Sequence, residues 1–409
     1  MSTEPALVPS EVSSDAPPEA PDALSNGVAT RPSSPARRGV RLDSLTGLRF
    51  FAAVLVFFSH ISLSGLFSDP RAGADAFNVA ARAGWIGVGF FFVLSGFVLT
   101  YSARTNDPAR YFWRRRFAKI YPNHAVTWII TMLLMAWVGQ KVTAAEAGAN
   151  LLLLHAWIPN FTYFDSVNPV SWSLCCEALF YALFPWLLRA IRRIPANLLW
   201  YAATVNVALI FAVPVVAELL PSTPVLPFAP VSDWQFWFVY LCPPVRVLDF
   251  VLGIVLARIV LEGKWIRLGL LPAGVFAVIG YVVMLKVPPL FAMTATTTIP
   301  LALLIAAAAA ADRDARRSVL RGRTMVWLGE ISFAFYMTHF LVIYYGHYLL
   351  GATRSWSDPG AIGVTAVFLA GSVLAAALLH RFVEVPLMRR IGRPPRVAPA
   401  TVPAEATAG

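Results

Sequence analysis

The sequence is short of charged residues. Of its 409 residues only 13% are Asp, Glu, Lys or Arg, while 58% are hydrophobic and the mean hydropathy is +0.64. A soluble globular domain has about 25% charged residues, so the composition excludes that class. It predicts an all-α, polytopic integral membrane protein.

Cysteine is scarce as well. The three cysteines, Cys175, Cys176 and Cys242, form no C-x-x-C pair, and each lies in or beside an apolar segment. This pattern excludes a disulfide framework and a thiolate metal site, and it favours packing roles. The sequence also has no dinucleotide-binding glycine pattern, and we expect no metal.

Acidic residues are fewer than basic ones, which gives a formal net charge of +11. The basic residues occur in short clusters between apolar runs, so they are typical of cytoplasmic loops rather than of a nucleic-acid surface. Residues 1–40 are rich in Pro, Ala, Ser and Glu and lack the apolar core of a signal peptide. They predict a disordered cytoplasmic tail, and residues 391–409 predict another, around a membrane domain at 41–390.

Apolar runs between the tails approach the ~20 residues that a membrane-spanning helix requires. We expect about ten spans: Thr46–Leu66, Gly84–Ala103, Pro122–Val138, Trp172–Leu188, Leu198–Leu220, Phe236–Val260, Leu268–Val287, Phe291–Ala311, Val326–Leu350 and Ala361–Phe382. Alternate connections are rich in Arg and Lys, which predicts that both termini are cytoplasmic in the cell membrane. The run Leu151–Ile158 is too short to cross and predicts an interfacial or re-entrant segment.

Two ionisable residues stand out in the first span, RLDSLTGLRFFAAVLVFFSHIS. Arg49 and His60 are eleven residues apart, so they lie on nearly the same helix face about 16 Å apart along the axis. Ionisable groups are costly in hydrocarbon and usually face protein or a water-filled cavity. A purely structural interpretation is an Arg49 side chain that reaches the headgroups and a His60 bonded to a neighbour.

A basic cluster, YFWRRRFAKIYP, precedes the third span, with Pro122 expected in the first helical turn. Its members are Arg114, Arg115, Arg116 and Lys119. They are consistent with topology alone, or with a phosphate grip for coenzyme A or for a membrane lipid.

Acidic residues also occur inside the spans. Glu177 is either paired with a neighbouring Arg or orients a functional histidine. Arg246 and Asp249 are spaced to pair with each other within the sixth span. For His339 the sequence favours a structural role, as an intramembrane histidine that is hydrogen-bonded to its neighbours.

Close helix contacts are expected at the small residues of the second span: Gly87, Gly89, Ser95 and Gly96.

Seven segments carry a resemblance to a known family. In order they are LTGLRFFAAVLVFFSH, FFFVLSGFVLT, RRRFAKIYP, SWSLCCEALFYALFP, RVLDFVLG, LGEISFAFYMTHF and FVEVP. The series resembles the membrane-bound acyltransferase 3 family across nearly all of Leu42 to Pro386. The resemblance implies transfer of an acyl group, most often acetyl, from acyl-CoA to a hydroxyl of a carbohydrate or glycosylated metabolite.

The resemblance also implies site residues. Arg49 and His60 match the family's Arg-x10-His signature, whose histidine is regarded as catalytic. Arg116 and Lys119 match an Arg-x-x-Arg element, with Lys in the second place. Lysine keeps the charge but loses the bidentate fork. Glu177 matches the acidic position of the Trp-Ser-Leu segment.

These residues predict a mechanism. His60 is expected to act as general base on a sugar hydroxyl, because histidine titrates near neutral pH. Arg49 is expected to stabilise developing charge or hold a phosphate, Arg114–Arg116 and Lys119 to bind acyl-CoA, and Glu177 to orient the imidazole. Both direct transfer and an acyl-histidine intermediate fit the sequence.

The acceptor stays open between a glycosylated metabolite, such as a macrolide, and a cell-envelope glycan. The RLDSLTGLRFFAA opening and the short single-domain chain resemble family members that act on macrolide sugars. The bias toward Ala, Arg and Pro is typical of a GC-rich bacterial coding sequence and favours the same acceptor. Two other classes are compatible with intramembrane His, Arg and Glu: a proton-coupled transporter, and an inactive relative that serves as a scaffold.

Overall fold

The computed structural model describes residues 41–103 and 107–391, so the predicted tail at 1–40 and all of the predicted tail at 391–409 except Ile391 lie outside the described residues. The described part is helical and contains no strands, only two isolated bridges. The first half contains α1 (Asp43–Ser62), α2 (Pro70–Ala80), α3 (Ala83–Tyr101), α4 (Ala109–Val138), α5 (Ala144–Leu151), η1 (His155–Trp157), α6 (Phe161–Phe164), η2 (Pro169–Ser171) and α7 (Trp172–Arg192).

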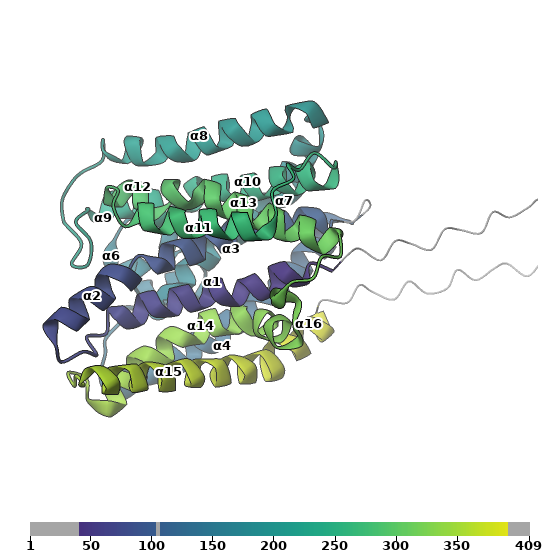
Figure 1. Ribbon diagram of the computed structural model, residues 1–409. Coiled ribbons are helices and arrows are strands. Elements are labelled where there is room, and N and C mark those ends of the chain that lie inside the picture. Colours follow the sequence, from purple (N-terminus) through teal and green to yellow (C-terminus); the bar gives the residue numbers. More distant parts are fainter. Residues whose placement is uncertain (1–40, 104–106, 392–409) are drawn as a thin grey trace, which may run out of the picture. The chain divides into compact units, whose positions relative to one another are not determined.

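The second half contains η3 (Ala196–Leu198), α8 (Leu199–Ala217), α9 (Asp233–Phe236), η4 (Trp237–Leu241), α10 (Pro243–Leu261), α11 (Leu270–Met284), α12 (Pro289–Met293) and α13 (Ala295–Arg313). It ends with η5 (Val319–Arg321), α14 (Arg323–Gly351), α15 (Asp358–Leu379), η6 (His380–Glu384) and α16 (Val385–Ile391). Figure 1 shows α1 and α3 in the middle of the bundle, α8 at one edge and α15 at the other.

The helix ranges agree broadly with the predicted spans, with three corrections. Pro122 lies inside α4, not in its first turn, because the basic cluster itself is helical from Ala109. The sixth range is broken at Cys242 between a π-helical turn and α10, and the eighth is broken at Thr294 between α12 and α13. Pro243 and Pro289 each begin a helix, where a missing N–H costs no hydrogen bond.

Seven helical segments among the described residues are long and apolar enough to cross a membrane. They are Asp43–Ser62, Pro70–Tyr101, Pro169–Arg192, Ala196–Ala217, Pro289–Arg313, Arg323–Gly351 and Asp358–Ile391. The count of ten spans and the cytoplasmic termini therefore stay predictions.

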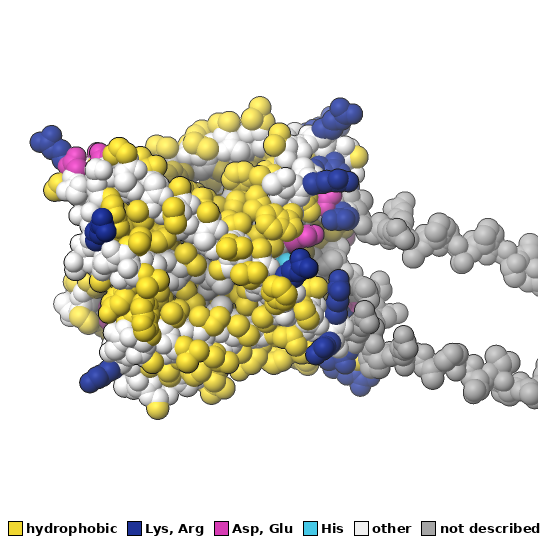
Figure 2. All heavy atoms as spheres, turned by 90° about the horizontal axis from the view of Figure 1, so that it is seen from below, with side chains coloured by type: hydrophobic (Ala, Val, Ile, Leu, Met, Phe, Trp, Pro, Cys, Tyr) yellow, Lys and Arg dark blue, Asp and Glu magenta, His cyan; other side chains and the backbone are white. Residues whose placement is uncertain are grey.

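Hydrophobic side chains cover the sides of the bundle, and Lys and Arg gather mainly at one end (Figure 2). We call this the basic end; α1 begins there and α16 lies there (Figure 1). Large apolar side chains such as Leu133, Leu271 and Leu374 are more than 60% exposed on the sides. A lipid environment accounts for this exposure, because water would penalise so large an apolar surface.

Glycine contacts hold the central helices together. A Cβ on Gly96 of α3 would lie 2.0 Å from the Phe250 carbonyl oxygen of α10, and one on Gly253 would lie 2.0 Å from the Val93 oxygen. This confirms the close contact predicted at Gly96, and a similar backbone contact confirms it at Gly87. Gly89 has only an ordinary side-chain contact at 3.5 Å.

The predicted Arg246–Asp249 pair is confirmed. Arg246 Nε lies 3.3 Å from Asp249 Oδ2, and both side chains are buried. The Arg246 guanidinium also lies 5.0 Å from the Phe92 ring centre. The pair therefore joins α10 to α3 from inside the protein.

Candidate active site

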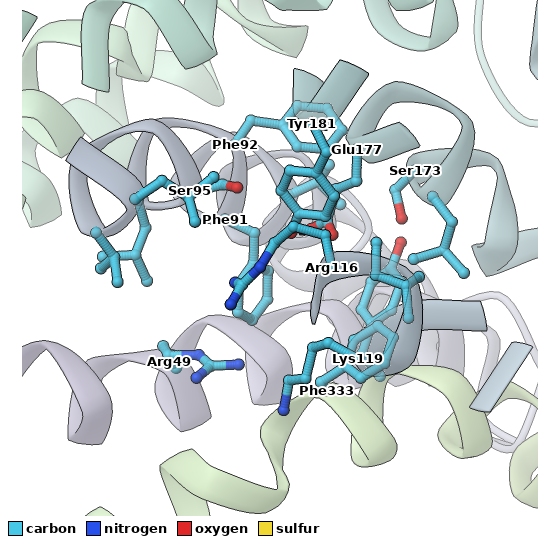
Figure 3. Close-up of a pocket in the computed structure, with 17 residues that line it drawn as sticks. Arg49, Phe91, Phe92, Ser95, Arg116, Lys119, Ser173, Glu177, Tyr181 and Phe333 are labelled. Carbon is cyan, nitrogen blue, oxygen red and sulfur yellow. Dashed lines mark hydrogen bonds between the residues drawn. The ribbon is translucent and has the colours of Figure 1, made fainter. Parts of the chain in front are cut away.

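A cavity lies between α1, α3, α4, α7 and α14, and we call it the chamber (Figure 3). Its empty volume is about 890 Å³, counted to its open mouth. Its walls combine nine apolar side chains with eight polar ones. These polar residues are Arg49, Ser95, Arg116, Lys119, Ser173, Glu177, Tyr181 and Tyr336.

Three cations converge in the chamber. In Figure 3 the charged ends of Arg49, Arg116 and Lys119 point into the same space. Among the described residues, Arg49 and Arg116 have no carboxylate within 4.0 Å, although Arg116 lies 6.0 Å from the ring centre of Tyr181. Two guanidinium groups without an acidic partner make the chamber suited to an anion.

Lys119 is held differently from the two arginines. Its ammonium pairs with Glu384, a carboxylate that is 1% exposed and that accepts a second hydrogen bond from Asn123 Nδ2 at 2.9 Å. Glu384 ends the π-helical turn η6, and such turns often occur at functional sites. The ion pair fixes Lys119 at the wall of the chamber and offsets part of its charge.

A second hollow opens at the basic end, and we call it the vestibule. Its basic residues are Arg115, Arg116, Arg189 and Arg192. The vestibule shares Leu99 and Arg116 with the chamber, so the two cavities are adjacent. Arg189 and Arg192 follow an apolar run, and the sequence analysis interpreted such clusters only as cytoplasmic-loop residues. Nothing in their spacing placed them beside the basic cluster on α4.

The structure thus divides the predicted acyl-CoA residues. Arg116 and Lys119 line the chamber. Arg115 lines the vestibule but forms a two-point ion pair with Asp107. Arg114 lines neither cavity, and its guanidinium lies 5.9 Å from the Tyr111 ring centre. The helical period explains this, because successive residues of α4 point in different directions.

His60 does not line the chamber, although Arg49 on the same helix does. Its Nδ1 lies 2.9 Å from Nε2 of His339 on α14, and its ring stands edge-on to Phe340 at 5.4 Å. His339 is fully buried. The two imidazoles therefore form a contact between α1 and α14, which we call the histidine pair.

Hydrogen bonding fixes the tautomers of the neutral histidine pair. His339 Nδ1 lies 2.8 Å from the Tyr336 carbonyl oxygen and 3.2 Å from that of Phe335. Carbonyl oxygens only accept, so His339 Nδ1 must carry the proton and its Nε2 must accept. His60 Nδ1 then donates to His339, which leaves the lone pair of His60 on Nε2, where a general base needs it.

The side chain that contacts the His60 imidazole is His339, not the expected Glu177. Glu177 was expected to orient the imidazole, but it accepts a hydrogen bond from Tyr181 Oη at 2.9 Å inside the chamber. The reason is position, because His60 lies about three turns beyond Arg49 along α1. His339, for which the sequence favoured a structural role, holds the orienting position instead.

Tyr336 connects the two halves of the site. Its side chain lines the chamber and donates from Oη to the Val170 carbonyl oxygen at 2.9 Å, while its own carbonyl accepts from His339. Tyr336 therefore contacts both the chamber and the histidine pair.

Fold and site together define a polytopic membrane protein with an internal cationic chamber. Comparison with known proteins identifies its family. The chain belongs to the acyltransferase 3 family, because residues 42–381 match the family model described as an acyltransferase domain. This confirms the resemblance seen in the seven sequence segments.

Similar proteins include Acyltransferase MdmB of Streptomyces mycarofaciens, which is 42% identical over 377 residues, covering 90% of this chain and 97% of the relative. Peptidoglycan O-acetyltransferase OatA of Listeria monocytogenes is 27% identical over 161 residues, covering 35% of this chain and 24% of the relative. Nodulation protein 10 of Rhizobium leguminosarum is 31% identical over 163 residues, covering 36% and 44% respectively. No solved structure matches the chain.

Proposed function

We propose that this protein is a membrane O-acyltransferase that moves an acyl group, acetyl or another short chain, from acyl-CoA to a sugar hydroxyl. The acceptor is a glycosylated metabolite such as a macrolide, or a cell-envelope glycan. The observation that carries the proposal is the histidine pair, which leaves a lone pair on His60 Nε2 beside a cationic chamber.

In the proposed reaction His60 Nε2 takes the proton from the acceptor hydroxyl while its oxygen attacks the thioester carbon. The C–S bond breaks, and the coenzyme A thiolate receives the proton from the His60 imidazolium. The products are the acyl ester and free coenzyme A, and His60 is neutral again. His339 keeps Nδ1 of His60 protonated, so Nε2 alone can accept the proton.

The donor fits the arrangement of cations. Coenzyme A carries several phosphates, and the adjacent vestibule and chamber present four arginines that could bind them: Arg116, Arg189, Arg192 and Arg49. The span of about 16 Å from Arg49 to His60 along α1 suits the extended pantetheine arm. Phosphates held near Arg49 and Arg116 would let the thioester approach the histidine pair.

The macrolide acceptor is supported by the similarity to Acyltransferase MdmB, a macrolide-related relative, over 97% of its length. The match to peptidoglycan O-acetyltransferase OatA covers only a quarter of that protein. A glycan acceptor on the far side of the membrane would require the acyl group to pass the Tyr336 wall.

Membranes that contain the protein or its His60→Ala variant at equal abundance test the proposal. Each receives radiolabelled acetyl-CoA or propionyl-CoA and a host extract, and the label is followed into small-metabolite, lipid and polysaccharide fractions. We expect label in one fraction only with His60 present, and that fraction identifies the acceptor class.

Two results would overturn the proposal. His60-independent labelling would mean that another residue or protein performs the transfer. A lack of labelling by the folded protein from either donor would favour a transporter, detected as solute uptake into vesicles, or a scaffold.

A further inference from the structure

The first turn of α1 has no capping side chain of its own. Its N-cap residue is Leu42, whose side chain accepts no hydrogen bond. The first N–H groups of a helix lack partners within the helix, and a Ser, Thr, Asp or Asn at the N-cap usually accepts one of their hydrogen bonds. The start of α1 therefore needs an acceptor from another part of the chain.

Asp312 of α13 supplies this acceptor. Its Oδ2 accepts a hydrogen bond from the Ser44 N–H at 2.8 Å, and its Oδ1 accepts one from Ser44 Oγ at 2.7 Å. Arg321 of η5 lies beside the same carboxylate, with its Nε 3.5 Å from Oδ1. Because Asp312 is 1% exposed, its carboxylate depends on these partners rather than on water.

Asp312 lies at a position that its own helix disfavours. It is the penultimate residue of α13, and the C-terminal end of a helix carries partial negative charge. The N-terminal end of α1 carries partial positive charge, which stabilises a carboxylate. The requirements of α1, and not those of α13, therefore account for an aspartate at this position.

Two close backbone contacts involve the same part of α1. A Cβ on Gly47 would lie 2.4 Å from the Leu320 carbonyl oxygen of η5, and one on Gly329 of α14 would lie 1.8 Å from the Thr46 carbonyl oxygen of α1. Both η5 and α14 therefore pack directly on the backbone of the first turns of α1. These contacts leave little space for the helix to shift once Asp312 has fixed its first turn.

Arg49 follows shortly after this turn. It lies five residues beyond Ser44, about 7.5 Å along the helix axis, and its charged end points into the chamber (Figure 3). His60 lies near the opposite end of α1, where it contacts His339. A change at the start of α1 therefore reaches Arg49 before it reaches His60.

We propose that Asp312 is a positioning residue for Arg49: by capping α1 it keeps the Arg49 guanidinium aimed into the chamber, where the acyl-CoA phosphates bind. The inference rests on the proposed function, because it takes the donor to be the anion that Arg49 binds. Asp312 lines neither the chamber nor the vestibule, so it acts through the helix and not by contact with the donor.

The test measures the dissociation constant of acetyl-CoA for the protein in lipid nanodiscs, together with kcat for transfer of acetyl label. Asp312→Ala removes both acceptor oxygens from Ser44, and we expect the dissociation constant to rise about fivefold while kcat changes less than about twofold. Asp312→Asn keeps one acceptor oxygen and should restore much of the affinity.

Asp314→Ala is the matched control. Asp314 is an exposed carboxylate two residues further along the chain, where it pairs with Arg313 and lines neither cavity. This variant also removes one negative charge from the end of α13. It should bind acetyl-CoA as the unmodified protein does.

A second variant shows whether Asp312 acts through Arg49. Arg49→Gln alone should raise the dissociation constant about tenfold, because it removes a hydrogen bond between charged groups. In that background Asp312→Ala should add less than about twofold, since the two changes then affect one interaction.

Hydrogen exchange over α1 gives a measurement that needs no ligand. Asp312→Ala should speed exchange of the amides of residues 43–49 about fivefold or more, because their turn loses its cap. Exchange of residues 56–62 should stay unchanged, since the contact between His60 and His339 is kept.

Three results would contradict the proposal. One is an unchanged dissociation constant in folded Asp312→Ala protein, which would leave Asp312 a structural role only. Another is an equal rise with and without Arg49. The third is a fall in kcat as large as the rise in the dissociation constant, which would mean that α1 moves as a whole.

Failure of the proposed function has a different signature. The unmodified protein would then not bind acetyl-CoA in the nanodiscs. Unchanged hydrogen exchange at residues 43–49 in Asp312→Ala would instead overturn the role of Asp312, whatever the protein binds.

Discussion

Arg49 and His60 lie on one helix, yet their surroundings differ. Arg49 faces a chamber with two further cations and has no carboxylate within 4.0 Å among the described residues. His60 is held by a buried histidine and an aromatic ring. The first setting suits binding of an anion, and the second fixes one proton acceptor in place. Under the proposed function, Arg49 belongs to a binding half of the site and His60 to a chemical half.

The largest expected effect comes from breaking the chemical half. We expect His60→Gln to lower kcat about 10³-fold, because general base catalysis contributes roughly 10²–10⁴-fold. The dissociation constant for acetyl-CoA should change less than about threefold, since His60 lies outside the chamber. Steady-state rates and nanodisc binding check this, and a parallel loss of binding would show that the two halves are not separate.

The binding half is tested by comparing two neighbours in the basic cluster. Arg116→Gln should raise the KM for acyl-CoA about tenfold or more, because a hydrogen bond to a charged group contributes about 1.5–3 kcal/mol. Arg114→Gln should change it less than about threefold, since Arg114 lines neither cavity. Equal effects on KM would contradict the placement of the donor.

A third pair of variants tests whether His339 positions His60 or has only a structural role. His339→Leu leaves His60 Nδ1 without its acceptor, and we expect kcat to fall about tenfold while KM is kept. His339→Gln supplies an amide oxygen near the former Nε2 and should restore much of kcat. If the Gln variant is as slow as the Leu variant in correctly folded protein, His339 does not position His60.

The smallest effect concerns stability rather than catalysis. His155 lies in η1, outside the candidate spans, and burial, followed by the nearby charge of His124, lowers its pKa from 6.5 to about 3. The unfolded chain therefore binds a proton below about pH 6.5 that the folded protein does not bind. Stability should fall by about 1.4 kcal/mol per pH unit between those two values as the pH decreases.

Thermal unfolding in detergent measures this effect as a decrease of about 2 °C per pH unit below pH 6.5. His155→Gln places an amide near the former Nε2, which contacts Ser171 Oγ, and should flatten the dependence. An unchanged slope in this variant would assign the acid sensitivity to other groups.

Much of the helical scaffold could be predicted from the sequence. Apolar runs, glycines at close contacts and the spacing of Arg246 and Asp249 are local properties. The helices, the close contacts at Gly87 and Gly96 and the Arg246–Asp249 pair appear in the structure, whereas Gly89 makes only an ordinary contact. Breaks at Cys242 and Thr294 were not predicted, because a continuous apolar run does not reveal where the backbone turns.

The sequence by itself determined the helical class, the membrane-protein composition and the placing of Arg49 and His60 on one face of α1, since these depend on composition and helical period. Only the tertiary structure decided that His339 contacts His60, that Glu177 bonds Tyr181, and that Arg189 and Arg192 join the vestibule. These are contacts between helices distant in the chain. Helix packing sets them, and no local pattern encodes it.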